Sequence, residues 1–69
     1  MQHSVTEIAN IYSKLSEMRK DKKLFKKDDF IQFAKDNMNK YSLIEIGDDL
    51  LVSTWYSGDL IEDYRKTIK

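Results

Sequence analysis

The chain has 69 residues, no cysteine, and 12 basic against 12 acidic side chains, so its formal net charge is zero. This length allows one domain with a small core and leaves no room for the second lobe of a conventional cleft enzyme. Without cysteine there is no disulfide, thiolate nucleophile or zinc–thiolate site, so packing or self-association must stabilise the fold.

The composition is that of a folded globular domain, because 41% of the residues are hydrophobic and 12% are aromatic. No apolar run approaches the roughly 20 residues of a membrane span. The first residues, MQHSV, lack the basic and apolar regions of a secretory signal. We therefore expect no membrane partner and a cytoplasmic location, or a nuclear one in a eukaryotic cell.

Residues 1–3 are expected to be a flexible tail in front of one domain over residues 4–69. A first helix is predicted from about residue 5 to 20, because Ser4 and Glu7 have the spacing of a capping box. Apolar residues then recur at three- and four-residue intervals on one stripe: Val5, Ile8, Ile11, Tyr12, Leu15 and Met18. The following RKDKK suits a helix C-terminus, where the dipole favours cations.

The next apolar pair, Leu24 and Phe25, is predicted to be a minimal strand or a loop plug. A second helix is predicted to begin near KKDD, because Asp28 and Asp29 suit the positive end of a helix dipole. Its apolar residues would be buried: Phe30, Phe33, Ala34 and Met38. The asparagines of DNMNK favour a break after it.

The period then changes from helical to alternating. Residues 42–46, SLIEI, and residues 50–56, LLVSTWY, predict a β-hairpin around the turn GDD. In the second strand Leu50 and Val52 share one face, and Trp55 lies on the opposite face from Tyr56. A last helix would start at Ser57 or Asp59 and keep four apolar residues at helical spacing: Leu60, Ile61, Tyr64 and Ile68. The predicted fold class is α+β, in the order α-α-β-β-α.

The stretch IYSKLSEMRKDKKLFKKDDFIQFAKDNMNKYSLIEI resembles, in its spacing, the winged-helix tail of the replication-initiator and origin-recognition ATPases. In that family a tyrosine-containing helix leads to a short apolar strand, a phenylalanine-bearing helix and the strand that starts the wing. The matching residues here are Tyr12, Leu24, Phe30, Leu43 and Ile44. The resemblance covers about residues 8–68 and implies a small winged-helix-like single domain.

The chain departs from this family after Phe33. The segment AKDNMNKYS lacks the glycine that usually precedes the wing and has little apolar periodicity of its own. Either one or two turns around residues 35–41 form a recognition helix, or the second helix runs straight into the hairpin.

The resemblance implies DNA binding by the helix-turn-helix region and the wing. The side chains that would face a groove are Lys35, Asn37, Asn39, Lys40 and Tyr41. Those that would neutralise phosphates are Lys20, Lys22, Lys23, Lys26 and Lys27. The alternative is that the asparagines cap a helix and the lysines form a hydrated loop. The zero net charge also argues against DNA binding, because domains that bind DNA are usually basic.

The acidic last third favours a second class of function, since residues 42–63 hold six acids and no base. Because Trp55 and Tyr56 point to opposite faces of a strand, one ring would stay near the surface. The carboxylates around it would be Asp48, Asp49, Asp59, Glu62 and Asp63. An exposed aromatic ring with carboxylates is typical of a surface that docks on a basic partner, such as a nucleic-acid enzyme. The alternative is that the final helix covers both rings.

Neither a catalytic nor a metal site is predicted. The one histidine, His3, lies in the expected tail, and the adjacent Asp48 and Asp49 have no third ligand. No phosphate-binding glycine motif or nucleophile elbow is present in the sequence. The sequence therefore predicts a non-catalytic binding module without a cofactor. Nucleic acid is the first expected partner and another protein the second, and homodimer formation is left open.

Overall fold

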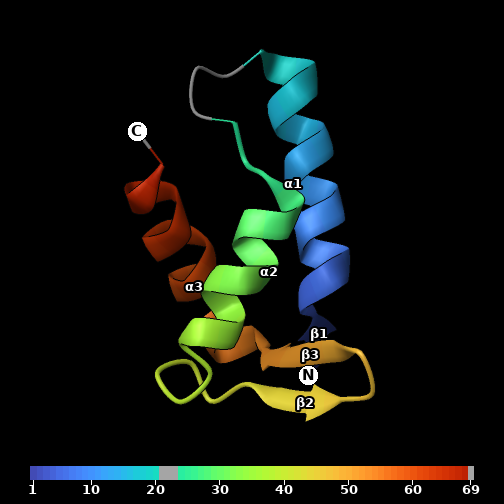
Figure 1. Cartoon of the computed structure of the whole chain (residues 1–69), viewed down its shortest axis with the longest axis vertical. Helices are drawn as coiled ribbons and strands as arrows, with labels where there is room; N and C mark the ends of the chain where they lie inside the picture. Colours follow the sequence, from blue (N-terminus) through green and yellow to red (C-terminus); the bar gives the residue numbers. More distant parts are fainter. Residues whose placement is uncertain (21–23, 69) are drawn as a thin grey trace.

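A computed structural model describes residues 1–20 and 24–68, which form three helices and a three-stranded antiparallel sheet (Figure 1). Along the chain lie β1 (Gln2–Ser4), α1 (Val5–Arg19), α2 (Lys27–Asp36), β2 (Ile44–Ile46), β3 (Asp49–Ser53) and α3 (Thr54–Thr67). The predicted α+β class is confirmed, but the order is β-α-α-β-β-α. None of the helices in the described ranges is long and apolar enough to cross a membrane.

The first residues form an edge strand where a flexible tail was predicted. β1 pairs with β3, and His3 lies opposite Val52. The carbonyl oxygen of Met1 accepts a hydrogen bond from the backbone N–H of Thr54 at 2.9 Å. The His3 ring Nε2 lies 2.9 Å from the hydroxyl of the same threonine. A strand of three residues has too little alternation to be read, and its partner is about fifty residues away in sequence.

Helix α1 begins and ends close to the predicted residues. The Ser4 hydroxyl accepts a hydrogen bond from the backbone N–H of Glu7 at 3.2 Å, as in the predicted capping box. At the other end Lys20 adopts a left-handed conformation, with φ 53°, and its N–H is bonded to the last turn of the helix. Such a residue satisfies the free carbonyl groups that a helix leaves at its C-terminus.

The buried face of α1 is rotated from the predicted stripe. The residues that face the core are Val5, Ile8, Ala9 and Ser16. Ile11, Leu15 and Met18 are exposed instead. The reason lies in Ser16, whose hydroxyl accepts the backbone N–H of Phe25 at 3.0 Å and so holds the returning chain over this side of the helix.

The segment before α2 is a loop plug and not a strand. The Phe25 ring is buried, and its centroid lies 4.8 Å from those of both Phe30 and Tyr64. Leu24 beside it is exposed. The Tyr64 hydroxyl accepts the backbone N–H of Lys26 and donates to its carbonyl oxygen, both at 3.3 Å. These bonds join α3 to the start of α2.

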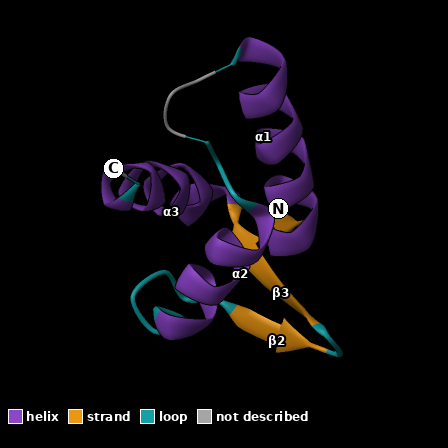
Figure 2. Ribbon diagram, turned by 45° about the horizontal axis from the view of Figure 1, so that its top comes forward, coloured by secondary structure: helices purple, strands orange, loops and turns teal. Residues whose placement is uncertain are grey.

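The predicted hairpin is present, with Gly47 and Asp48 connecting β2 to β3. Gly47 has a φ of 58°, which suits the first position of a two-residue turn. Leu50 and Val52 of β3 point into the core, as expected from alternation. Figures 1 and 2 both show β2 farther from α1 than β3 is.

The last helix begins earlier than predicted. Trp55 and Tyr56 were predicted to end the second strand, yet they lie in the first turn of α3. β3 is paired with β1 as far as Ser53 and with β2 only as far as Leu51. The N–H of Thr54 still bonds to the carbonyl oxygen of Met1. Beyond Thr54 neither β1 nor β2 extends far enough to pair with the backbone, which satisfies its polar groups in a helix instead.

Candidate binding surfaces

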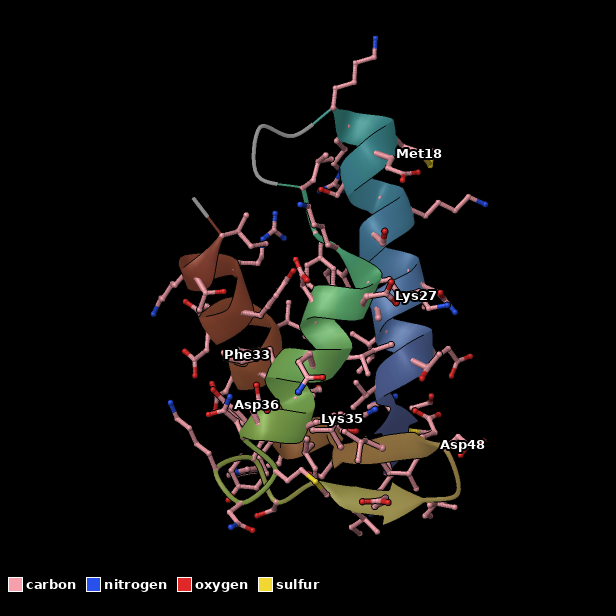
Figure 3. The ribbon with its side chains drawn as sticks, in the orientation of Figure 1. Met18, Lys27, Phe33, Lys35, Asp36 and Asp48 are labelled. Carbon is pink, nitrogen blue, oxygen red and sulfur yellow. The ribbon has the colours of Figure 1, made fainter. Side chains whose placement is uncertain are left out.

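The described lysines among those predicted to contact DNA do not form one cluster. Lys20 ends α1, and Lys26 and Lys27 lie at the start of α2. Lys35 lies at the far end of α2, eight residues and about 12 Å from Lys27. Figure 3 shows these two lysines at different heights on the molecule. Lys22 and Lys23 lie outside the described residues.

The outer face of α2 is acidic. Asp28, Asp29 and Asp36 are exposed along it, together with Gln32. The amide of Gln32 donates to the carboxylate of Asp36 at 3.0 Å. A phosphate backbone laid on this face would meet three carboxylates, so α2 opposes the nucleic-acid contact that was predicted for this region.

The segment after α2 forms turns, and the described chain has no separate helix between α2 and β2. The side-chain amide of Asn37 donates to the carbonyl oxygen of Phe33 at 2.8 Å, so it caps α2 as the alternative prediction held. Lys35, Asn39 and Lys40 stay exposed. With neighbouring residues they line an open hollow of about 510 Å³.

Tyr41 was predicted to face a DNA groove, but only 2% of its surface is exposed. Its hydroxyl donates to the carboxylate of Asp63. Burial, and then this bond and the carboxylate charge, raise the pKa of Tyr41 to about 12. The same hydrogen bond lowers the pKa of Asp63, and Lys40 lies 3.7 Å from that carboxylate. Tyr41 therefore holds the turn against α3 and offers no surface to a ligand.

A different set of cations lies around a small hollow between the side chains of α1 and α3. Arg19 and Arg65 line the same small hollow, about 30 Å³, beside Phe25. Lys26 lies close to Arg65, because the Lys26 backbone is bonded to the hydroxyl of the neighbouring residue, Tyr64. We call Arg19, Arg65 and Lys26 the basic end. Of these three residues the sequence predicted only Lys26 as a phosphate contact; it missed Arg19, and it missed Arg65 because that residue lies some 40 positions farther along the chain.

Trp55 is the most exposed ring of the molecule's described part, with 84% of its surface accessible. Tyr56 is partly buried and packs against the core. The prediction that one of these two rings stays at the surface is confirmed, although both lie on a helix. Asp59 and Glu62 follow Trp55 at i+4 and i+7 on the same side of α3, and both are exposed. We call these three residues the Trp55 face.

The remaining predicted carboxylates do not join the Trp55 face. Asp49 accepts hydrogen bonds from the Ser4 and Thr6 hydroxyls and from the backbone N–H groups of Thr6 and Leu50. Burial raises the pKa of Asp49, but these four bonds outweigh burial and lower it. Asp63 is bonded to Tyr41, and Asp48 is exposed in the hairpin turn. Asp49 and Asp63 therefore have structural roles.

The described residues contain no group of three or more histidine, cysteine, aspartate or glutamate side chains that could hold a metal ion. Comparison with protein-family models, with curated proteins and with solved structures finds no match.

Proposed function

We propose that this protein is a non-catalytic module that docks on a basic surface of another protein through the Trp55 face. The observation that supports this proposal is the 84% exposure of Trp55. Tryptophan is buried on average in folded proteins, and burying its ring in an interface removes a large apolar area from water. Tryptophan is also among the residues that most often dominate binding energy.

The neighbours of Trp55 favour a cationic partner. Asp59 and Glu62 lie one and two turns farther along α3, and this part of the helix has no basic residue before Arg65. Carboxylates beside an aromatic anchor steer a basic surface toward it and add orientation. A helix holds the three side chains at fixed spacing, which lowers the entropy lost on binding.

Random peptides displayed on phage would test this proposal. The wild-type protein should enrich peptides rich in lysine and arginine around an apolar residue, and binding should change the fluorescence of Trp55, the chain's single tryptophan. Trp55→Ala should weaken binding at least about tenfold, as for a typical hot spot. Met18→Ala is the matched control, because Met18 is 70% exposed but lies on α1. Peptides that bind Trp55→Ala equally well would refute the proposal.

A second candidate function is association with DNA, which the winged-helix resemblance implies. The basic end supports it, because cations from α1, α3 and the segment before α2 lie together there. Two features count against it: the short strand precedes the first helix instead of following it, and the outer face of α2 is acidic. In this proposal phosphates contact the basic end and not α2.

Binding to mixed-sequence duplex DNA at low and moderate salt separates the two candidates. A variant with Arg19 and Lys26 changed to glutamine should lose salt-sensitive binding. A variant with Lys35 and Lys40 changed to glutamine removes the same charge elsewhere and should bind like the wild type. Absence of binding at low salt would eliminate the DNA proposal.

A further inference from the structure

Strand β2 is an edge of the sheet, because the strand order β1-β3-β2 leaves it paired on one side only. All three of its residues are exposed. Ile46 and Asp49 flank the two-residue turn and therefore form a hydrogen-bonded pair. Pair types alternate along an antiparallel ladder, so Glu45, opposite Leu50, directs its backbone N–H and C=O away from β3.

The two faces of β2 differ in character. Ile44 and Ile46 lie on one face, with 46% and 56% of their surfaces exposed. Glu45 lies on the other face and lines an open hollow of about 390 Å³ with Asp48 and Lys35. Figure 3 shows Lys35 and Asp48 at the sheet end of the molecule. Free backbone groups are thus flanked by apolar side chains on one face and, on the other, by the carboxylates of Glu45 and Asp48 with one cation, Lys35, in the same hollow.

We propose that β2 binds an extended segment of another protein, added as an antiparallel strand, in which a basic residue stands between two apolar residues. The segment's backbone pairs with the free N–H and C=O of Glu45, as in other cases of strand addition. Its basic side chain lies on the same face as Glu45 and Asp48, and its apolar side chains lie beside Ile44 and Ile46. This inference goes beyond the Trp55 face, since it uses no residue of α3.

The charge of Glu45 argues against a second copy as the occupant. The backbone N–H of Leu43 is already bonded to the carbonyl oxygen of Met38 at 2.9 Å, and Gly47 lies in the turn. Self-pairing of two β2 strands would therefore be centred on Glu45. Each carboxylate would stand directly opposite its own copy, which is destabilising. A basic residue in that position is attracted instead.

Two capped peptides test the proposal directly: Thr-Val-Lys-Val-Thr and the matched Thr-Val-Glu-Val-Thr, titrated to millimolar concentration against ¹⁵N-labelled protein. The lysine peptide should shift the amide resonances of residues 44–46 and slow hydrogen exchange at Glu45. The glutamate peptide should bind about fivefold more weakly, because an opposite-charge cross-strand pair is replaced by a like-charge pair. Equal binding of the two peptides, shifts confined to other elements, or no shifts at all would overturn the proposal.

Three substitutions of Glu45 separate the contribution of its backbone N–H to peptide binding from that of its carboxylate. Glu45→Gln keeps the free N–H and should bind both peptides with equal affinity. Glu45→Lys should reverse the preference in favour of the glutamate peptide. Glu45→Pro removes an N–H that points away from the ladder, which an edge strand tolerates, and should abolish binding. Trp55→Ala should leave the lysine peptide's affinity unchanged.

Retention of lysine preference by Glu45→Lys would refute the charge argument. Binding by a folded Glu45→Pro variant would refute strand addition. If the wild type forms a dimer in which the amides of β2 are protected from hydrogen exchange, a second copy of the chain pairs with β2. That result would refute the proposed peptide partner.

Discussion

The two ends of the molecule are built in opposite ways. At the helical end the rings of Tyr12, Phe25, Phe30 and Tyr64 form one cluster, with neighbouring centroids 4.8 to 5.4 Å apart. At the sheet end β2 exposes all its side chains. Burial of large rings supplies most of the stability of a domain this small. The sheet end can therefore carry a surface whose side chains are chosen for binding and not for folding.

The most direct test of this contrast compares the free energies of unfolding of Phe30→Ala and Ile46→Ala. Phe30 is fully buried, so its truncation should cost about 3–5 kcal/mol of the free energy of unfolding. The total for 69 residues is only about 3–10 kcal/mol, so this variant should be largely unfolded. Ile46→Ala should change stability by less than about 0.5 kcal/mol. Urea denaturation followed by circular dichroism measures both, and similar losses in the two variants would contradict the contrast.

Asp49 joins the sheet to α1, because its carboxylate in β3 accepts hydrogen bonds from Ser4, the last residue of β1, and from Thr6 in the first turn of α1. Asp49→Asn should lower the free energy of unfolding by about 2 kcal/mol, since charge-assisted hydrogen bonds are replaced by neutral ones. The folded-state pKa of Asp49 is lowered, so its contribution is present above the unfolded pKa of about 4 and is lost as the pH falls through the folded value.

The free energy of unfolding measured at several pH values between neutral and strongly acidic tests this linkage. The wild type should lose stability steadily on acidification, and Asp49→Asn should lose less over the same range. Asp48→Asn is the control, because its side chain is exposed in the turn. Equal acid sensitivity of wild type and Asp49→Asn would show that the carboxylate does not stabilise the junction between the sheet and α1.

Replacing each of the two glycines with alanine compares how the same substitution affects stability in the hairpin and in α3. Gly47 in the hairpin has a φ of +58°, whereas Gly58 lies within α3, and a Cβ added at either would have no atom within 4 Å apart from its chain neighbours and its own helix backbone. Gly47→Ala should destabilise by about 1 kcal/mol through left-handed strain. Gly58→Ala should stabilise by about 1 kcal/mol through helix propensity. Thermal unfolding gives both signs, and a shift in the same direction for both would contradict the assigned conformations.

The sequence predicted the elements whose signals are local and repeated. The capping pair Ser4 and Glu7, the helical spacing in α2 and the alternation at Leu50 and Val52 each depend on neighbours within a few residues. It missed β1, because this strand is defined by its pairing with β3, and it placed the start of α3 too late, because the end of β3 is set by the ends of β1 and β2. Pairing between residues about fifty positions apart leaves no local pattern.

The candidate surfaces were predicted in part for a similar reason. An exposed aromatic at residues 55–56 follows from the local sequence, and Trp55 meets that expectation. The local sequence does not show which carboxylates remain free for binding. Asp49 and Asp63 accept hydrogen bonds from Thr6 and Tyr41, which belong to distant elements. A count of charges along the chain cannot separate carboxylates that hold the fold from those that face solvent.

A loss of stability at high pH is expected at Tyr41, which holds the turn before β2 against α3. Its pKa is raised to about 12, so its contribution to stability is complete below the unfolded value of about 10 and is lost as the pH rises toward 12. Between about pH 9 and pH 11 the wild type should lose stability more steeply than Tyr41→Phe. Asp63→Asn should have an intermediate slope, because it removes the hydrogen bond and the charge but leaves the burial. Parallel slopes in all three proteins would mean that this bond does not couple the sheet end to the helices in solution.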